Sequence, residues 1–175
     1  ECSGRMLAIR CSPPDAETAC YHVNVYMPAG PDNATWQKIS REILRVGRMA
    51  KQEGALMVVC GDFNANVAPE GRCGYSEAEA ASKTIRRRDS LLSRLVKNSD
   101  LQVGAHLNSC GNRTHTWSGW EKSAILDYCL FSREAVFTSG KASKIKHVPV
   151  IDHKMISSTF PARQMGHVRP ATKEG

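Results

Sequence analysis

The most informative segment of the sequence reads Ala55-Leu56-Met57-Val58-Val59-Cys60-Gly61-Asp62-Phe63-Asn64. Its first six residues are apolar without interruption, and a short run of this kind predicts a strand buried on both faces. Gly61 lets the backbone turn sharply where the run ends. Asp62 and Asn64 are therefore predicted to point into a cleft at the edge of a sheet. The alternative is an Asx turn, in which Asp and Asn side chains bond their own backbone.

Two helices and several strands are predicted around this segment. Asp32 or Asn33 can cap a helix that ends at Gly54, and its residues at helical spacing form one apolar stripe. The stripe consists of Trp36, Ile39, Ile43, Val46 and Ala50. A second helix is predicted over residues 82–98, strands over residues 6–9, 21–26, 114–117, 124–131 and 155–160, and a loop over residues 65–80. This mixture predicts the α+β fold class, with helices packed on a sheet layer.

Length and composition describe one ordinary globular domain. The chain has 175 residues, of which 41% are hydrophobic and 23% are charged, and this excludes collagen, coiled coils and full disorder. The longest clear apolar run is far shorter than the roughly 18 residues of a membrane span. We predict one domain over residues 1–162 and a basic, flexible tail over residues 163–175. Seven cysteines with no CxxC pair favour a reducing compartment and argue against structural zinc.

The positive charge is concentrated in the second half of the chain. Residues 1–82 carry 8 basic and 10 acidic side chains, whereas residues 83–175 carry 16 and 7. A basic half suits a polyanionic partner, because Lys and Arg contacts to phosphate release condensed counterions. Arg86, Arg87 and Arg88 lie in the second helix and are candidates for contacts with nucleic-acid phosphates. A solvated helix face is the alternative interpretation.

Two further segments place acidic side chains in or after predicted strands. Asp127 interrupts an otherwise apolar strand, where a carboxylate is costly to bury unless it is paired. Asp152 and His153 are adjacent and offer an oxygen ligand beside a titratable imidazole. Each segment alone also has a structural interpretation without function. Asp127 could lie on a solvated edge strand, and Asp152 and His153 could lie in a solvated loop.

Taken together and in this order, these segments resemble the endonuclease/exonuclease/phosphatase superfamily, which has the DNase I-like α/β sandwich fold. Within it they are most similar to the apurinic-type endonuclease domains of LINE-type, non-LTR retrotransposons. The resemblance covers roughly residues 5–160, and it implies a metal-dependent hydrolase that nicks DNA. The matching motifs are Asn24-Val25-Tyr26-Met27-Pro28, Gly61-Asp62-Phe63-Asn64-Ala65-Asn66, Thr114-His115-Thr116-Trp117, Leu126-Asp127-Tyr128 and Asp152-His153.

The resemblance implies catalytic roles for Asp62, Asn64, Asp127 and His153, and a metal-binding role for Asp152. Asp62 would orient or deprotonate the attacking water, and Asn64 would hold that water or the scissile phosphate. His153 would contact the phosphate, and Asp127 would hold His153 in its cationic form. Asp152 would help to bind the divalent metal, normally Mg²⁺ with Mn²⁺ as a substitute. The chemistry is consistent, because phosphodiester hydrolysis needs a positioned water and stabilisation of charge on the phosphoryl oxygens.

The same resemblance implies a catalytic role for Tyr26 and a role in DNA or phosphate binding for Thr116, Trp120 and Lys122. Tyr26 would contact the phosphate from the opposite wall, and Thr116 would support the same pocket. Trp120 and Lys122 lie in a segment that forms a DNA-contacting hairpin in similar nucleases, and an exposed aromatic ring there can stack on bases or enter the minor groove. For the nearby Trp117, packing in the core is the alternative to DNA contact.

Two departures from the family pattern change the expected activity. Ile151 stands where the family normally has a serine, which removes a polar contact but no metal ligand. The family's principal metal-binding Glu comes from an N-terminal half of the sandwich, and Glu1 lies only 25 residues before Tyr26. We therefore expect the C-terminal half of such a domain, with weak metal binding and little activity by itself. A missing half would expose Val58, Val59 and Leu130 on the inner face of the sheet.

The expected partners are DNA and, in the full-length protein, a linked reverse transcriptase. The expected location is intracellular and nuclear, with no membrane association. Two alternatives stay open at this point. The chain could be a catalytically inactive nucleic-acid-binding remnant, or it could be another phosphoesterase or an RNA deadenylase of the same superfamily.

Overall fold

The computed structural model describes residues 4–12, 18–67, 72–104, 115–133, 139–143, 152–153 and 155–159. Its centre is a five-stranded sheet in the order β1 (Met6–Cys11), β2 (Cys20–Tyr26), β3 (Leu56–Asp62), β8 (Asp127–Ser132) and β5 (Leu101–Val103). The helices among these residues are α1 (Asn33–Gln52), α2 (Glu77–Ala80) and α3 (Lys83–Asn98). Two smaller sheets are formed by β4 (Arg72–Cys73), β7 (Lys122–Ala124) and β6 (Trp117–Gly119), and by β10 (Met155–Thr159) and β9 (Ser139–Ser143).

A βαβ unit formed by β2, α1 and β3 organises the central sheet. β2 and β3 are parallel, whereas the other neighbouring pairs in the sheet are antiparallel, and a parallel pair needs a crossover such as α1. The carboxylate of Asp32 accepts a hydrogen bond from the backbone N–H of Thr35 at 3.0 Å and caps the helix. The apolar stripe predicted for α1 is confirmed, because all of its residues are buried.

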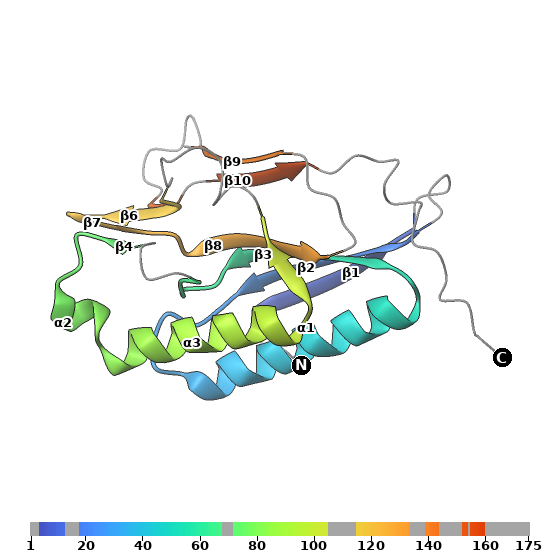
Figure 1. Ribbon diagram of the computed structural model, residues 1–175, viewed down its shortest axis with the longest axis horizontal. Helices are drawn as coiled ribbons and strands as arrows, with labels where there is room; N and C mark the ends of the chain where they lie inside the picture. The colour runs from blue at the N-terminus through green and yellow to red at the C-terminus, as the bar shows by residue number, and fades with distance from the viewer. Residues whose placement is uncertain are drawn as a thin grey trace.

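The main hydrophobic core lies between the sheet and the two long helices. Figure 1 shows α1 and α3 side by side on one face of the sheet, with β9 and β10 across the other face. Trp36 and Ile43 of α1 and Leu92 of α3 are 0% exposed, as are Val59 and Leu130 of the sheet. Fully burying side chains of this size contributes about 1.5–3 kcal/mol each. Among the described residues, the cluster on this face contains more buried side chains than the cluster on the opposite face.

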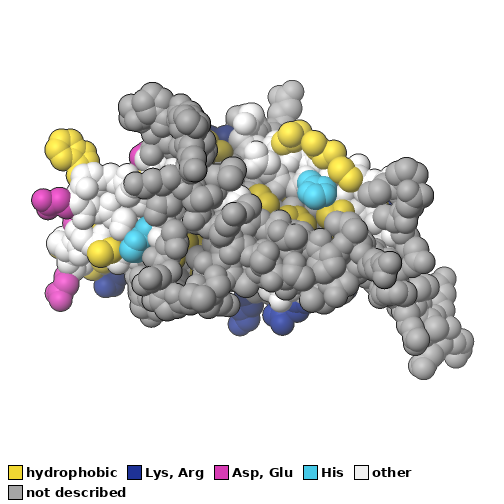
Figure 2. Space-filling view, turned by 90° about the horizontal axis from the view of Figure 1, so that it is seen from above, with side chains coloured by type: hydrophobic (Ala, Val, Ile, Leu, Met, Phe, Trp, Pro, Cys, Tyr) yellow, Lys and Arg dark blue, Asp and Glu magenta, His cyan; other side chains and the backbone are white. Residues whose placement is uncertain are grey.

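The opposite face of the sheet, here called the open face, is only partly covered. Leu7 and Ile9 of β1 are 59% and 50% exposed, and both line a shallow hollow on this face together with His22 and Val58. In Figure 2, uncovered hydrophobic side chains lie beside a histidine on this side of the molecule. Ile156 of β10 packs against a smaller apolar cluster there.

The expectation that Val58, Val59 and Leu130 share one exposed face is wrong for the last two residues. Val59 and Leu130 point towards the helices and are fully buried, while Val58 belongs to the cluster on the open face. The physical reason is the period of two in a strand, which sends successive side chains to opposite sides of the sheet. Adjacent residues such as Val58 and Val59 therefore cannot both face the same layer.

The strand predicted over residues 124–131 is interrupted. β7 ends at Ala124 and β8 begins at Asp127. The hydroxyl oxygen of Thr116 lies at the break and accepts hydrogen bonds from the backbone N–H groups of Leu126 and Asp127, at 2.9 and 3.0 Å. These donors are thus satisfied without a continuous ladder, and the chain can pass from one sheet to the next.

Several other elements of the structure differ from the predicted ones in type or in bounds. The loop expected over residues 65–80 contains β4 and α2, and Ser76 and Glu79 form a capping box that starts α2. The strand expected over residues 114–117 is wrong in its bounds, because β6 begins at Trp117 and only that residue is shared, while residue 114 lies outside the described residues. The strand β5 was not predicted. The tail over residues 163–175 lies outside the described residues. Among the described residues, no helix has the length and apolar character that crossing a bilayer requires.

Candidate active site

Asp62 and Asp127 lie directly opposite each other at neighbouring strand ends. They are register partners in the antiparallel pairing of β3 with β8, and Tyr26 at the end of β2 is paired with Asp62 on the other side. Gly61 lets β3 lie close to Val25 of β2, because a Cβ atom at position 61 would lie 1.9 Å from the Val25 carbonyl oxygen and the φ of Gly61 is +145°. Three strands therefore bring side chains of the predicted site to one end of the open face.

His153 is hydrogen-bonded to Asp127 and lies close to the carboxylate of Asp62. Its Nδ1 lies 2.9 Å from Oδ2 of Asp127, and its Nε2 lies 4.0 Å from Oδ2 of Asp62. An isolated β-bridge to Trp117 holds its backbone in place. Burial by itself would lower the pKa of His153, but the hydrogen bond and charge of Asp127, with the charge of Asp62, raise it above its usual value.

Asp62 has the environment of a general base. Burial is the largest cause that raises its pKa to about 6, and the like charge of Asp127 acts in the same direction. The hydrogen bonds from Asn64 and the charge of His153 oppose this shift. A carboxylate with a pKa in this range is ionised at neutral pH and still basic enough to accept a proton from water.

Asn64 is fixed against Asp62 by both its backbone and its side chain. Its backbone N–H donates to Oδ1 of Asp62 at 2.7 Å, and its side-chain amide donates to Oδ2 of Asp62 and to the carbonyl of Met27, both at 2.9 Å. Its φ is +48°, a conformation that Asn tolerates better than most residues. The Asx turn considered from the sequence is therefore present, and it also places the Asn64 amide at the candidate site.

Asp152 lies next to His153, and one of its carboxylate oxygens is bonded to β6. Its Oδ2 accepts a hydrogen bond from the indole N–H of Trp117 at 2.9 Å, and its backbone carbonyl accepts one from Ser118 at 2.8 Å. In the described part of the chain, no three His, Cys, Asp or Glu side chains are grouped to hold a metal ion. Asp62 and Asp152 are hard oxygen donors, which fit an Mg²⁺ ion held by one or two carboxylates and water. They do not form an all-protein cage.

Three further residues predicted for the pocket or for DNA contact have different environments. Tyr26 is 51% exposed, and the guanidinium of Arg5 lies 5.0 Å from the centre of its ring. Thr116 is 0% exposed, so its hydroxyl supports the start of β8 from inside the fold. Trp120 is fully exposed at the turn between β6 and β7, with a φ of +52°.

The ammonium group of Lys122, predicted to contact DNA, is already engaged within the protein. It forms an ion pair with Glu79 of α2 and lies 5.6 Å from the centre of the Tyr75 ring. The hydrogen bond from Lys122 is the largest cause that lowers the pKa of Glu79 to about 2. Lys122 thus fastens the β6–β7 hairpin to α2, and its contact with DNA stays a prediction.

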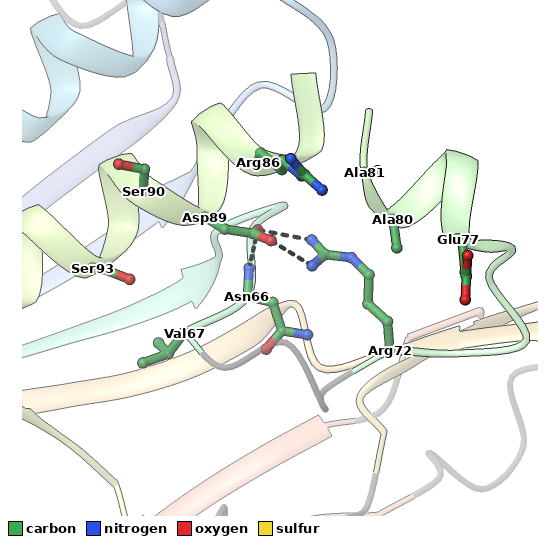
Figure 3. Close-up of a pocket in the computed structure, with 10 residues that line it drawn as sticks. All are labelled: Asn66, Val67, Arg72, Glu77, Ala80, Ala81, Arg86, Asp89, Ser90 and Ser93. Atoms are coloured by element: carbon green, nitrogen blue, oxygen red, sulfur yellow. Dashed lines mark hydrogen bonds and ion pairs between the residues drawn. The ribbon is translucent and has the colours of Figure 1, made fainter. Parts of the chain in front are cut away.

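The three neighbouring arginines of α3 have different environments. Arg86 and Arg87 are exposed, and Arg86 lines a pocket of about 690 Å³ between α2 and α3 (Figure 3). Arg88 is turned inward, where it donates a hydrogen bond to the carbonyl of Ala29 and where burial lowers its pKa. Only the first two therefore present their charge to the surface.

A buried network next to the pocket was not predicted from the sequence. The guanidinium of Arg72 donates two hydrogen bonds to Asp89, at 2.5 and 2.8 Å, and Asp89 also accepts the backbone N–H of Asn66 at 2.7 Å. Figure 3 shows these contacts on the pocket wall. The hydroxyl of Tyr128 donates to Oδ1 of Asn66 at 2.9 Å. The network holds the segment that follows Asn64, and no local sequence signal indicates it because its members come from distant elements.

Comparison with protein families supports the resemblance seen in the sequence. The model of the Endonuclease/Exonuclease/phosphatase family matches residues 5–150. The chain belongs to this family. The α+β, DNase I-like fold class is thereby confirmed, and the members of the family are nucleases and phosphatases. No curated protein matches the chain.

Several solved structures of nucleases share the fold of this chain. The endonuclease domain of TRAS1, a telomere-specific non-LTR retrotransposon, has a TM-score of 0.60 at 12% identity and matches 89% of this chain and 63% of its own. The catalytic domain of APE2 from Xenopus laevis has a TM-score of 0.65 at 17% identity, with 90% and 55% covered. The 3′ phosphatase NExo from Neisseria, bound to a product DNA hairpin, has a TM-score of 0.61 at 14% identity, with 90% and 65% covered. The chain thus spans less than two thirds of each of these structures.

Proposed function

We propose that this chain carries the hydrolytic centre of a metal-dependent DNA endonuclease that nicks one strand during retrotransposition. The observation that supports this most directly is the position of His153, which is bonded through Nδ1 to Asp127 while its Nε2 faces Asp62. A cationic imidazole beside a basic carboxylate is the pair of groups needed to hold a phosphate and activate water next to it.

The proposed mechanism assigns one task to each side chain. Asp62 takes a proton from the attacking water, since its pKa of about 6 keeps it ionised and basic at neutral pH. Asn64 orients that water or a phosphate oxygen with its amide. His153 stabilises the negative charge that develops on the phosphoryl oxygens, and Asp127 keeps the imidazole protonated and correctly turned.

A divalent cation would be held by Asp152 together with water and the substrate phosphate. When bound, Mg²⁺ or Mn²⁺ supplies further stabilisation of charge at the phosphate. The exposed position of Asp152 allows a cation to approach it from solvent. One protein carboxylate gives weak affinity, so we expect the metal to bind more tightly when substrate is present.

The proposed substrate is DNA, held by its backbone. Asn66 follows Asn64 by two residues, so the pocket that it lines begins within about 7 Å of the site along the chain. Arg86 in that pocket can take a backbone phosphate close to the one that is cut, and Trp120 at the hairpin turn can contact bases. The structure of the Neisseria relative with a DNA product supports this choice. We further propose a nuclear location and a linked reverse transcriptase, as in non-LTR elements.

A nicking assay on supercoiled plasmid with Mg²⁺ tests the proposal. The parent chain and the full reading frame that contains it are compared with Asp62→Asn and His153→Ala variants, and either substitution is expected to reduce nicking by about 10²-fold or more. Asp100→Asn, at an exposed ion pair with Arg133, is the matched control. Nicking by the two site variants at the parental rate would rule out this centre.

A non-enzymatic function is the second candidate, because no three-ligand metal group is found among the described residues. In that case the chain would bind DNA through Arg86 and its basic neighbours without cutting it. A gel-shift titration combined with the nicking assay separates the two functions. The second predicts salt-dependent binding without a nick in either the chain or the full reading frame. Release of phosphate from a 3′-phosphorylated oligonucleotide would instead indicate a phosphatase, as in the Neisseria relative.

A further inference from the structure

The indole of Trp117 is bonded to the carboxylate of Asp152. Trp117 lies in β6, and its Nε1 is 2.9 Å from Oδ2 of Asp152. Among the described residues, no other hydrogen-bond donor reaches that carboxylate. The bond joins a neutral donor to an ionised acceptor, which makes it stronger than a bond between two neutral groups.

Small residues on the hairpin leave room for the indole to lie in this orientation. A Cβ atom at Gly119 would lie 2.8 Å from Cζ2 of Trp117, so the six-membered part of the ring occupies the space where a side chain would be. Ala124, the register partner of Trp117 in β7, is fully buried. A larger residue at position 119 would displace the ring and, with it, the N–H group that reaches Asp152.

Backbone contacts hold the same segment but leave the carboxylate free to turn. The N–H of Ser118 donates to the carbonyl of Asp152 at 2.8 Å, and Trp117 forms a β-bridge with His153. These contacts fix where residues 152 and 153 lie beside β6. They do not select a rotamer for the Asp152 side chain, which is exposed and has several staggered positions available.

We propose that Trp117, seated over Gly119, is a positioning residue that orients Asp152 so that its second carboxylate oxygen is available to a hard divalent cation. The inference rests on the proposed function, because it takes Asp152 as the cation ligand. A single carboxylate in a mobile side chain loses rotamer freedom on binding a metal. The indole bond removes part of that cost before the metal arrives, and such supporting contacts typically change metal affinity by about 10–100-fold.

Binding of Mn²⁺ to the chain without DNA tests the inference, since Mn²⁺ substitutes for Mg²⁺ and free ion is counted directly by electron paramagnetic resonance. Trp117→Phe keeps an aromatic ring over Gly119 and deletes the N–H group. It is expected to weaken Mn²⁺ binding by about tenfold, with a thermal midpoint close to that of the parent. Trp120→Phe, the same substitution at the exposed hairpin turn, is expected to leave Mn²⁺ binding unchanged.

Asp152→Asn separates failure of the inference from failure of the proposed function. If Asp152→Asn weakens Mn²⁺ binding and Trp117→Phe does not, the inference is overturned and the metal assignment stands. If Asp152→Asn has no effect, or the parent binds no Mn²⁺, the metal assignment fails and the inference fails with it.

A second measurement covers the case in which Trp117→Phe lowers the thermal midpoint. The indole N–H signal of Trp117 in a ¹H–¹⁵N spectrum of the parent chain is expected to shift on titration with Mg²⁺, while the signal of the buried Trp36 stays in place. An unchanged Trp117 signal at saturating Mg²⁺ would overturn the inference.

Discussion

The two faces of the central sheet differ in what they do for the protein. The covered face meets α1 and α3 and consists of side chains such as Trp36, Ile43 and Leu92 that are fully buried. The open face has half-exposed Leu7 and Ile9 at one side and the carboxylates of the candidate site at the strand ends. The same strands therefore supply apolar packing on one side and chemistry on the other.

Strand β3 shows how one short strand can serve both purposes. In β3, Met57 and Val59 belong to the core under the helices, whereas Val58 and Cys60 lie on the other side with Asp62. The strict alternation of side chains in a strand makes this division possible. Changes on the two faces should consequently have different effects, and each of the following experiments tests that division.

Matched truncations of isoleucine on the two faces should give the largest difference. Ile43→Ala removes a fully buried side chain from the covered face and is expected to reduce the free energy of unfolding by about 2–5 kcal/mol. Ile9→Ala, at a position that is 50% exposed on the open face, should cost less than about 1 kcal/mol. Urea denaturation of both variants measures the contrast. Equal losses would mean that the open face is covered in solution.

Stability should depend on pH through Asp62 on the open face. The unfolded chain releases the proton of this carboxyl near the ordinary pKa of 3.8, while the folded chain releases it at about 6. The folded state binds the proton more tightly, so stability falls by up to about 3 kcal/mol as the pH rises from about 4 to 6, and this contribution then stays constant.

Asp62→Asn should abolish that part of the pH dependence and be more stable than the parent at pH 7. Urea denaturation of both proteins between pH 4 and pH 7 checks this expectation. A parent stability that rises across the same range more steeply than that of the variant would contradict the assigned environment of Asp62.

Asp127→Asn should lower the pKa of His153. In the parent, the hydrogen bond and charge of Asp127 outweigh the effect of burial, and the amide removes the charge but leaves the burial. The parent gains stability from this pair below the ordinary His pKa of 6.5 and loses it as the pH rises through the higher folded pKa. A ¹H NMR titration of the His153 ring measures the shift. Asp100→Asn, at an exposed ion pair, should leave the titration of His153 unchanged.

Leu7→Lys should have the smallest effect. Leu7 is 59% exposed, so a charged side chain can extend into solvent, and the free energy of unfolding should change by no more than about 0.5 kcal/mol. Sedimentation velocity of the parent and the variant, together with urea denaturation, is the measurement. A large loss of stability, accompanied by a smaller oligomer, would show that a second copy covers this part of the open face.

The covered face could be predicted from the sequence because its signals are local. The stripe from Trp36 to Ala50 repeats at helical spacing, and Asp32 and Gly54 mark its two ends, so α1 was predicted closely. The apolar run before Gly61 indicated β3 for the same reason. These patterns need no knowledge of distant residues.

The arrangement of the site could be predicted only in part, because it depends on pairings between distant residues. The motifs identified Asp62, Asn64, Asp127 and His153 as candidates, and the structure brings them together. The bond from Trp117 to Asp152 was not predicted, since it depends on how β6 meets a segment 35 residues later in the chain. The break before Asp127 was missed for a similar reason, because the hydroxyl that stabilises it comes from Thr116.

Because Gly61 lies so close to Val25, codon 61 of the gene should tolerate no amino-acid substitution. Every missense substitution at codon 61 adds a Cβ atom 1.9 Å from the Val25 carbonyl oxygen, and the neighbouring residue is Asp62. A mutational scan that scores protein abundance and the proposed nicking activity separately should therefore find both lost at this codon. At codon 62, the Asn substitution should leave abundance intact and remove nicking alone.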